Sequence, residues 1–312
     1  MILAKDFIET IEGLVFAVVE NGLEQGKVLC FLRYIKAGDQ WKKVNTTEAN
    51  QFLADQYPHY LYYSTVKQAH CHAVVLEQVF KHHKAKDRVK QLLMSEDNDL
   101  IESDCAKLCL LFQKQGLNLD FMGVTGSILI SAQGKNSDID LVFYSRETFN
   151  QARDITRKLI LQGECSEMSS ADWLESYDRR QCDLSYQEYI RHEKRKFNKA
   201  IFQQRKFDLS FVDGFGSGQN DKLVSYTKIE TIITQVQIID DTLSFDYPAE
   251  FSISHPEIDS IVCYTATYTG QAKTGEWVEV AGWIEQSTEG CKRIVVGSNR
   301  EACGEYIKVI NV

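Results

Sequence analysis

The chain has 312 residues, of which 44% are hydrophobic and 25% are charged, and its formal net charge is −9 at pH 7. This length allows two or three globular domains, and the acidic balance argues against a wholly basic nucleic-acid coat while permitting a local basic groove. No apolar run approaches the ~18 residues of a membrane span, no signal-peptide pattern opens the chain, and nine scattered cysteines suit a reducing compartment, so we expect a cytoplasmic protein.

The first part of the chain predicts an N-terminal α+β domain over residues 1–97. Two β-branched and aromatic runs surround a polar, glycine-containing connection over residues 13–36, a pattern typical of a hairpin. Helical periodicity follows near residues 46–56 and again near residues 75–93. The acidic, polar run at residues 95–99 then marks the first domain boundary.

The middle of the chain, residues 98–216, predicts an α/β (α+β) domain. Apolar residues at helical spacing from Ile101 to Phe112 predict a helix that Gly116 ends, and residues 147–163 predict a second helix. Strand patterns occur at residues 118–125, 137–145 and 206–214. A polar, partly helical insertion precedes the last of these strands, and the glycine-rich run at residues 214–221 predicts a loop.

The last part of the chain predicts a C-terminal β-rich domain over residues 217–312, a small sheet or barrel. From about Thr242 onward it consists of short alternating runs separated by glycine. The run GEWVEVAGWIEQ, residues 275–286, resembles the first strands of oligonucleotide-binding barrels. Four aromatic residues here either stack on bases or form the barrel core: Tyr264, Tyr268, Trp277 and Trp283.

Two carboxylates in the middle domain indicate a metal site. Asp138 and Asp140 stand two residues apart in a predicted strand, so both side chains leave the sheet on the same side. The repulsion between them requires a divalent cation, an arginine or a shared proton. Paired oxygen ligands suit Mg²⁺ or Mn²⁺, which take further ligands from water and substrate phosphates. If the strand that carries Asp208 lies beside the first one, the three acids converge on a site for two metal ions.

The order of these residues resembles the nucleotidyltransferase superfamily typified by DNA polymerase beta. The shared pattern is Gly126-Ser127, ten intervening residues, the run DIDL at residues 138–141, and later the run FDL at residues 207–209. The resemblance covers residues 100–214 and implies a central nucleotidyltransferase-type mixed sheet with helices, flanked by the N-terminal and C-terminal domains. It also implies that Asp138, Asp140 and Asp208 bind Mg²⁺ and are catalytic, while Gly126 and Ser127 contact the phosphates of an NTP.

A basic stretch, RHEKRKFNKAIFQQRK at residues 191–206, precedes Asp208. On a helix, four of its side chains would share one face: Arg191, Arg195, Lys199 and Phe202. We expect Arg195 and Lys199 to contact a triphosphate or an RNA backbone, and the alternative is a solvated helix that balances the acidic body. A second basic tract, residues 81–88, predicts an exposed helix face.

Taken together, the sequence predicts a Mg²⁺-dependent nucleotidyltransferase that transfers a nucleoside monophosphate from an NTP to an acceptor hydroxyl. We rank an RNA end first as acceptor, ahead of a protein or a small molecule, because of the basic stretch and the expected barrel. The alternative is a non-catalytic nucleotide-binding or RNA-binding module on the same fold. A metal-dependent phosphohydrolase is a weaker third hypothesis.

Overall fold

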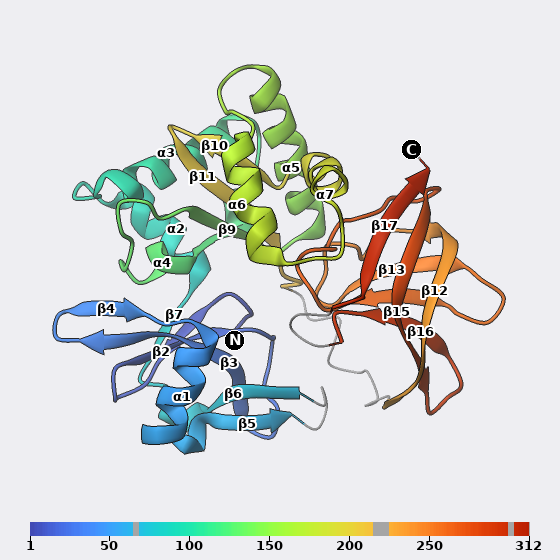
Figure 1. Cartoon of the computed structure of the whole chain (residues 1–312). Coiled ribbons are helices and arrows are strands. Elements are labelled where there is room, and N and C mark those ends of the chain that lie inside the picture. The colour runs from blue at the N-terminus through green and yellow to red at the C-terminus, as the bar shows by residue number, and fades with distance from the viewer. Residues whose placement is uncertain (65–68, 215–224, 299–302, 312) are drawn as a thin grey trace. The chain divides into compact units, whose positions relative to one another are not determined.

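Figure 1 presents a computed structural model that describes residues 1–64, 69–214, 225–298 and 303–311. Within these ranges the chain forms a mixed α/β structure of seven α-helices and three β-sheets. It divides into two compact units, Met1–Cys165 with Ile201–Ser217, and Ser166–Ala200 with Gly218–Val312. No helix in the described ranges is long and apolar enough to cross a membrane. The loop predicted at residues 214–221 lies outside these ranges except for Gly214.

The N-terminal sheet has the strand order β5-β6-β3-β2-β1-β7, and β4 pairs with β3. Its strands are β1 (Phe7–Glu9), β2 (Leu14–Val18), β3 (Lys27–Ala37), β4 (Gln40–Lys43), β5 (Leu61–Ser64), β6 (Ala69–Val75) and β7 (Lys81–His83). Strands β2 and β3 pair antiparallel, which confirms the predicted hairpin. Helix α1 (Thr46–Gln56) forms as predicted, and its Ala49 and Leu53 pack into the core on one face of this sheet.

The helix predicted near residues 75–93 is shorter than expected. A 3₁₀ turn at Leu76–Gln78 and strand β7 come first, and helix α2 occupies only Ala85–Met94. Strand β7 pairs antiparallel with β1, and the imidazole of His82 lies 2.8 Å from the carboxylate of Asp6. These long-range partners outweigh the local helical pattern, and they also mean that the basic tract is not a single exposed helix face.

The second sheet has the order β10-β11-β9-β8, in which β9 is antiparallel to β8 and parallel to β11. Its strands are β8 (Met122–Thr125), β9 (Ile139–Phe143), β10 (Lys199–Phe202) and β11 (Arg205–Phe211). Helices α3 (Leu100–Lys114) and α5 (Arg146–Leu161) cover one face, where Phe112 meets Phe207 and Phe149 meets Phe211. The predicted helices and strands of this region are thereby confirmed.

The opposite face of the second sheet packs in part against the N-terminal sheet. Val142 and Tyr144 share one buried cluster with Phe7, Val15 and Tyr34 from the N-terminal strands. The two sheets therefore belong to one compact unit. This arrangement places N-terminal side chains beside the face on which Asp140 stands.

The C-terminal strands form a closed ring in the order β12-β13-β14-β16-β15, and β12 pairs with β15 to complete it. The strands are β12 (Tyr226–Asp240), β13 (Ala249–Ser254), β14 (Ser260–Cys263), β15 (Trp277–Ser287), β16 (Lys292–Val296) and β17 (Tyr306–Asn311), drawn from orange to red in Figure 1. Strand β17 extends the sheet beside β15. Strands β14 and β16 are parallel, and the other pairs in the ring are antiparallel.

Helices α6 (Ser170–Arg180) and α7 (Tyr186–Lys194) pack on the barrel core, which includes Trp173 and Tyr189. The compact units therefore differ from the three consecutive segments predicted from sequence. The insertion that was placed in the middle domain belongs with the barrel, because its apolar side chains are buried there. The predicted boundary between residues 97 and 98 lies inside the first unit, and the one between residues 216 and 217 lies outside the described residues.

Candidate active site

The turn after β8 brings the backbone against an acidic side chain. Gly126 begins the one-turn helix α4 (Gly126–Leu129) with a φ of +68°, a conformation that L side chains rarely adopt. A Cβ atom built on Gly126 would lie 2.1 Å from Oδ2 of Asp140, so only glycine fits between the turn and this carboxylate. Ser127 follows directly and lines the same pocket.

The strand register brings the third predicted acid to the first two. Asp208 on β11 stands directly opposite Asp140 on the parallel neighbour β9, and Thr125 on β8 stands opposite Asp140 from the other side. Directly paired residues on neighbouring strands face the same side of a sheet, and Asp138 precedes Asp140 by two residues. The three carboxylates therefore lie on the face away from α3 and α5.

The electrostatics of Asp140 reflect this crowding. Burial raises the pKa of Asp140 to about 6, with a further increase from the negative charges of Asp208 and Asp138, while Lys5 and Lys43 oppose the rise. Carboxylates that lie close together repel one another and so favour the protonated form, and a bound cation would offset this repulsion.

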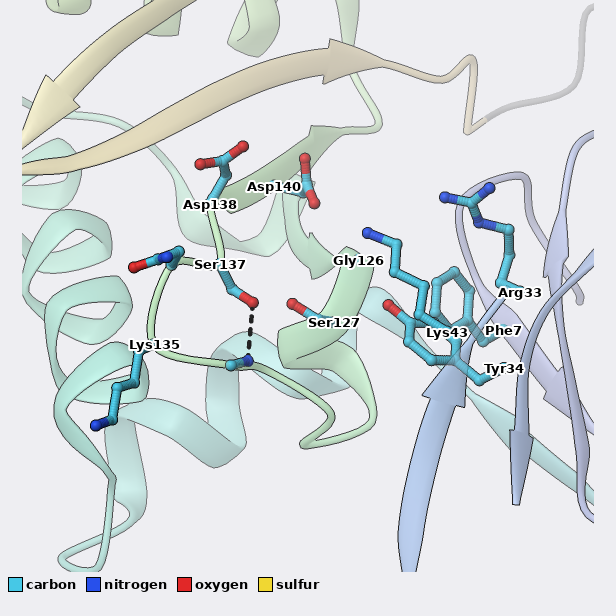
Figure 2. Close-up of a pocket in the computed structure, with 12 residues that line it drawn as sticks. Phe7, Arg33, Tyr34, Lys43, Gly126, Ser127, Lys135, Ser137, Asp138 and Asp140 are labelled. Atoms are coloured by element: carbon cyan, nitrogen blue, oxygen red, sulfur yellow. Dashed lines mark hydrogen bonds between the residues drawn. The ribbon is translucent and has the colours of Figure 1, made fainter. Parts of the chain in front are cut away.

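A pocket of about 470 Å³ opens beside Asp138 and Asp140 (Figure 2). It is lined by side chains from both sheets of the first unit: Phe7, Arg33, Tyr34, Lys43, Gly126, Ser127, Gly134, Lys135, Asn136, Ser137, Asp138 and Asp140. Figure 2 shows the carboxylates on one side of the pocket, and Arg33 and Lys43 on the other side. The structure thus brings together four predicted site residues, and Asp208 meets Asp140 from the next strand.

The loop before Asp138 is held by hydrogen bonds from two directions. The backbone N–H of Gly134 donates to Oγ of Ser137 at 3.0 Å, the dashed line in Figure 2. Arg205, at the start of β11, donates from Nη1 to the carbonyl oxygens of Lys135 and Ser137 at 3.3 and 2.8 Å. Arg205 is therefore a positioning residue that fixes the loop leading into Asp138.

Sequence reasoning missed the N-terminal side of this pocket. Arg33, Tyr34 and Lys43 come from β3 and β4, far along the chain from the carboxylates. The local sequence gives no signal of the bulge, because residues 28–32 are a continuous apolar run in which no alternation can break. Nothing in this run indicates which site its neighbours face.

The donor set of this site suits a hard divalent cation. Carboxylate and hydroxyl oxygens are ligands that Mg²⁺ prefers, and Mg²⁺ usually keeps several waters or substrate oxygens in place of a complete protein cage. Among the described residues, no group of three or more His, Cys, Asp or Glu side chains is arranged as a complete metal site. A cation at Asp138 and Asp140 would therefore need further oxygen ligands from water or from a bound substrate.

Comparison with known proteins places the chain in a family. It is 33% identical to the uncharacterised protein MJ1086 of Methanocaldococcus jannaschii, over 98% of each chain. The chain belongs to the MJ1086 family. No protein-family model matches the chain, and no solved structure matches it.

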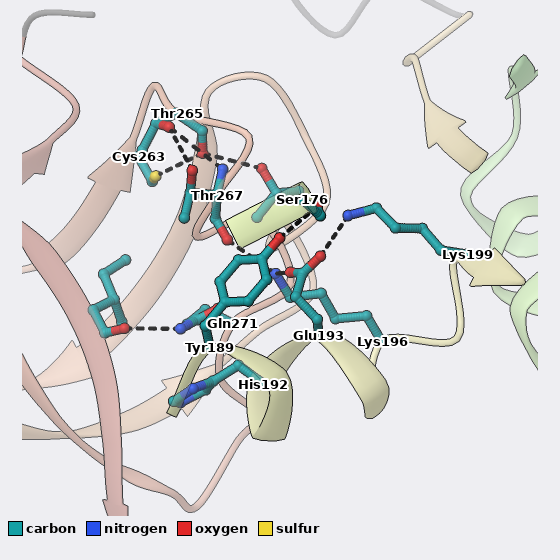
Figure 3. A network of polar contacts seen from close by, with 12 residues as sticks. Ser176, Tyr189, His192, Glu193, Lys196, Lys199, Cys263, Thr265, Thr267 and Gln271 are labelled. Carbon is teal, nitrogen blue, oxygen red and sulfur yellow. Dashed lines mark hydrogen bonds and ion pairs between the residues drawn. The ribbon is translucent and has the colours of Figure 1, made fainter. Parts of the chain in front are cut away.

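The basic stretch of this MJ1086-family chain is arranged differently from the predicted single helix. Helix α7 ends at Lys194, and Lys199 lies on strand β10, because β10 pairs with β11. The guanidinium of Arg195 contacts both carboxylate oxygens of Glu276, at 2.6 and 2.5 Å. Lys199 forms an ion pair with Glu193 (Figure 3). Both predicted phosphate ligands thus have carboxylate partners in the second unit, and their contact with phosphate stays a prediction.

The ion pair at Lys199 belongs to a buried network, shown in Figure 3. Glu193 also pairs with Lys196, whose Nζ donates to the carbonyl oxygen of Thr267 at 3.0 Å. Burial alone would raise the pKa of Glu193, but the two ammonium groups lower it to about 2. The network joins α7 to the barrel loop at Thr267 and accounts structurally for part of the basic stretch.

The four aromatic candidates of the barrel divide into two groups in this MJ1086-family chain. Tyr268 is buried in the barrel core, which is the second of the two alternatives predicted for it. Trp277 is 42% exposed, and Trp283 and Tyr264 are half-buried. The outward side chain of Trp283 has Nζ of Lys228 5.4 Å from its ring centroid, so aromatic and basic groups meet on the barrel surface.

Proposed function

We propose that the protein is a Mg²⁺-dependent nucleotidyltransferase that transfers a nucleoside monophosphate from an NTP to an acceptor hydroxyl. The observation that carries this proposal is the parallel register of Asp208 with Asp140, beside Asp138 and the Gly126-Ser127 turn. An isolated pair of acids in a strand is compatible with a solvated surface. Three acids on one face, next to a pocket lined by cations and a glycine turn, support phosphoryl chemistry instead.

Each residue has a distinct role in this proposal. Asp138, Asp140 and Asp208 would hold Mg²⁺, which when bound would offset phosphate charge and lower the pKa of the attacking hydroxyl. Asp208 accepts the proton of that hydroxyl. Ser127 and the backbone at Gly126 contact the phosphate oxygens, since the turn points its groups into the pocket. The acceptor oxygen attacks the α-phosphorus, the phosphoanhydride bond between the α- and β-phosphates breaks, and the products are a phosphodiester and pyrophosphate.

We rank an RNA end first as the acceptor. The five-stranded ring of the second unit resembles the oligonucleotide-binding barrel, a small Greek-key barrel. Exposed aromatic side chains such as Trp277, together with Lys228 beside Trp283, supply stacking surfaces and positive charge on its outer side. A protein hydroxyl and a small molecule are the other acceptor classes that the experiment below distinguishes.

A non-catalytic nucleotide-binding or RNA-binding module is the second candidate. It is favoured by the absence of a complete three-ligand metal group among the described side chains. In that case the pocket binds an NTP and the carboxylates tune its affinity, without transfer. The two candidates differ in one measurable property, which is the appearance of label in an acceptor.

The test is incubation of the purified protein with each of four α-³²P-labelled NTPs, Mg²⁺ or Mn²⁺, and total cellular RNA or protein. The double variant Asp138→Asn/Asp140→Asn removes the proposed metal ligands and keeps their shape. Asp120→Asn, an exposed acid outside the pocket, is the matched control. Label that appears with the wild type and Asp120→Asn but not with the double variant supports transfer and identifies the base and the acceptor class. Metal-dependent NTP binding without label supports the binding module.

A further inference from the structure

A β-bulge turns two consecutive residues of β3 toward the pocket. Val15 pairs with Tyr34 and Phe16 pairs with Leu32, so Arg33 is an extra residue on β3. Leu32 and Ile35, on either side of the bulge, both pack into the core on the α1 face of the sheet. Arg33 and Tyr34 therefore both face the other side, where regular alternation would send only one of them.

A second cation joins them from the neighbouring strand. Lys43 on β4 stands directly opposite Tyr34, and cross-paired residues share a face of the sheet. Tyr34 is only 3% exposed and is supported by the ring of Phe7, whose centroid lies 6.0 Å away. Figure 2 shows the hydroxyl of Tyr34 directed towards Ser127, and the ammonium group of Lys43 directed towards Asp140. The hairpin β3–β4 thus forms a rigid wall opposite the carboxylates.

Arg33 and Lys43, the two cations of this wall, form no ion pair with a carboxylate of the described residues. In the ranges that the structure describes, no Asp or Glu oxygen lies within 4.0 Å of the charged groups of Arg33 or Lys43. Arg195 and Lys199, by contrast, are paired with Glu276 and Glu193.

From this placement we propose that Arg33 and Lys43 hold the β- and γ-phosphates of the bound NTP. The inference rests on the proposed nucleotidyltransferase function and adds to it the residues that grip the leaving pyrophosphate. Arg33 presents a planar guanidinium that matches two phosphate oxygens, and Lys43 adds a compact charge. A triphosphate brings several negative charges next to three carboxylates, and two cations on the facing wall offset that repulsion. Tyr34 fixes the spacing between the two cations, because it is buried against Phe7.

The test measures equilibrium binding, so it does not depend on turnover or on knowing the base. The probe is inorganic tripolyphosphate with Mg²⁺, titrated calorimetrically at low salt into the full-length wild type, Arg33→Gln, Lys43→Gln and Lys42→Gln. Lys42 is the matched control, because it pairs with Ile35 on the other face of the same strand and does not line the pocket. The same four proteins are titrated with the four NTPs and the four NMPs.

We expect Arg33→Gln and Lys43→Gln each to weaken tripolyphosphate and NTP binding roughly tenfold, as the loss of one charged hydrogen bond does. NMP binding is expected to change little, because an NMP lacks the β- and γ-phosphates that the two cations would hold, and Lys42→Gln is expected to match the wild type. We expect the melting temperatures of these variants to equal that of the wild type, because removing either cation leaves no buried carboxylate without a partner. Equal melting temperatures would exclude misfolding as the cause of weaker binding.

Three results would overturn the inference. If Arg33→Gln and Lys43→Gln bind tripolyphosphate as tightly as Lys42→Gln, the wall does not hold the phosphates, and nucleotidyl transfer by the wild type would still stand. If NMP binding falls as much as NTP binding, the cations act on another part of the nucleotide. If the wild type binds neither tripolyphosphate nor any NTP, the proposed function fails together with the inference.

Discussion

Replacing Gly126 with alanine tests whether the turn must touch Asp140. The new Cβ would lie 2.1 Å from Oδ2 of Asp140, well inside van der Waals contact, and the residue would keep a φ of +68°. The left-handed backbone costs an L residue about 1–2 kcal/mol. The contact adds to this cost, because either the turn or the carboxylate has to move. A displacement of about 1 Å in a reacting constellation lowers a rate roughly 100-fold.

We therefore expect Gly126→Ala to lose about 1–2 kcal/mol or more of unfolding free energy and at least roughly 100-fold in labelled transfer. Two controls separate the causes. Gly163→Ala has a φ of +75° with open space around its Cβ, so it carries the backbone cost alone. Gly134→Ala lines the same pocket and has open space at an ordinary φ, so it carries neither cost.

Chemical denaturation measures the first quantity, and the α-³²P transfer assay, with Mg²⁺-dependent NTP binding by calorimetry, measures the second. A Gly126→Ala protein that is as stable as Gly163→Ala and binds and transfers like Gly134→Ala would refute the reasoning. It would mean that Asp140 relaxes away from the turn without consequence.

Two further predictions concern buried groups outside the pocket. Burial lowers the pKa of His72 from 6.5 to about 4, and its Nδ1 accepts the backbone N–H of Leu32 at 2.9 Å, so protonation opposes folding. Between these two values the unfolded chain binds more protons than the folded one, so lowering the pH from about 6.5 to 4 should cost about 3 kcal/mol of unfolding free energy. Chemical denaturation of His72→Gln over the same pH range should not show this loss. If the unfolding free energies of the wild type and His72→Gln fall equally with pH, the prediction is wrong. Glu193→Gln leaves Lys196 and Lys199 without their shared carboxylate, so the unfolding free energy should fall by about 3–5 kcal/mol. The double variant Glu193→Gln/Lys196→Met should recover part of this free energy, because it also removes one of the two ammonium groups that lose this carboxylate. A loss below about 1 kcal/mol in urea denaturation would show that the network relaxes or is hydrated.

The local parts of the site could be predicted from sequence because their signals are short-range. The strand that breaks at Gly126, the paired acids Asp138 and Asp140 at the start of β9 and the helices on either side follow from apolar periodicity, capping residues and glycine. The predicted helices at residues 46–56 and 147–163 and the β-rich C-terminal part are present for the same reason. Each of these patterns is complete within a few turns or one strand, so its meaning does not depend on distant contacts.

Long-range pairing decided the rest. Strand β7 forms where a helix was predicted, and Lys199 lies on β10, because in each case a neighbouring strand supplies the ladder partners. The charges of the basic stretch pointed to phosphate, but a count of cations does not reveal that Glu276 and Glu193 lie beside two of them. These strand and ion-pair partners belong to other elements, so the local sequence does not predict them.

By itself, the sequence determined that Asp138 and Asp140 share one face, since a strand alternates with period two. Only the tertiary structure decided that Asp208 stands beside Asp140, and that a bulge in the N-terminal sheet turns Arg33 and Tyr34 towards the same pocket. The physical reason is that a side chain's direction is set by its own backbone. Its neighbours across a sheet or a pocket are set by the burial of apolar surface throughout the unit.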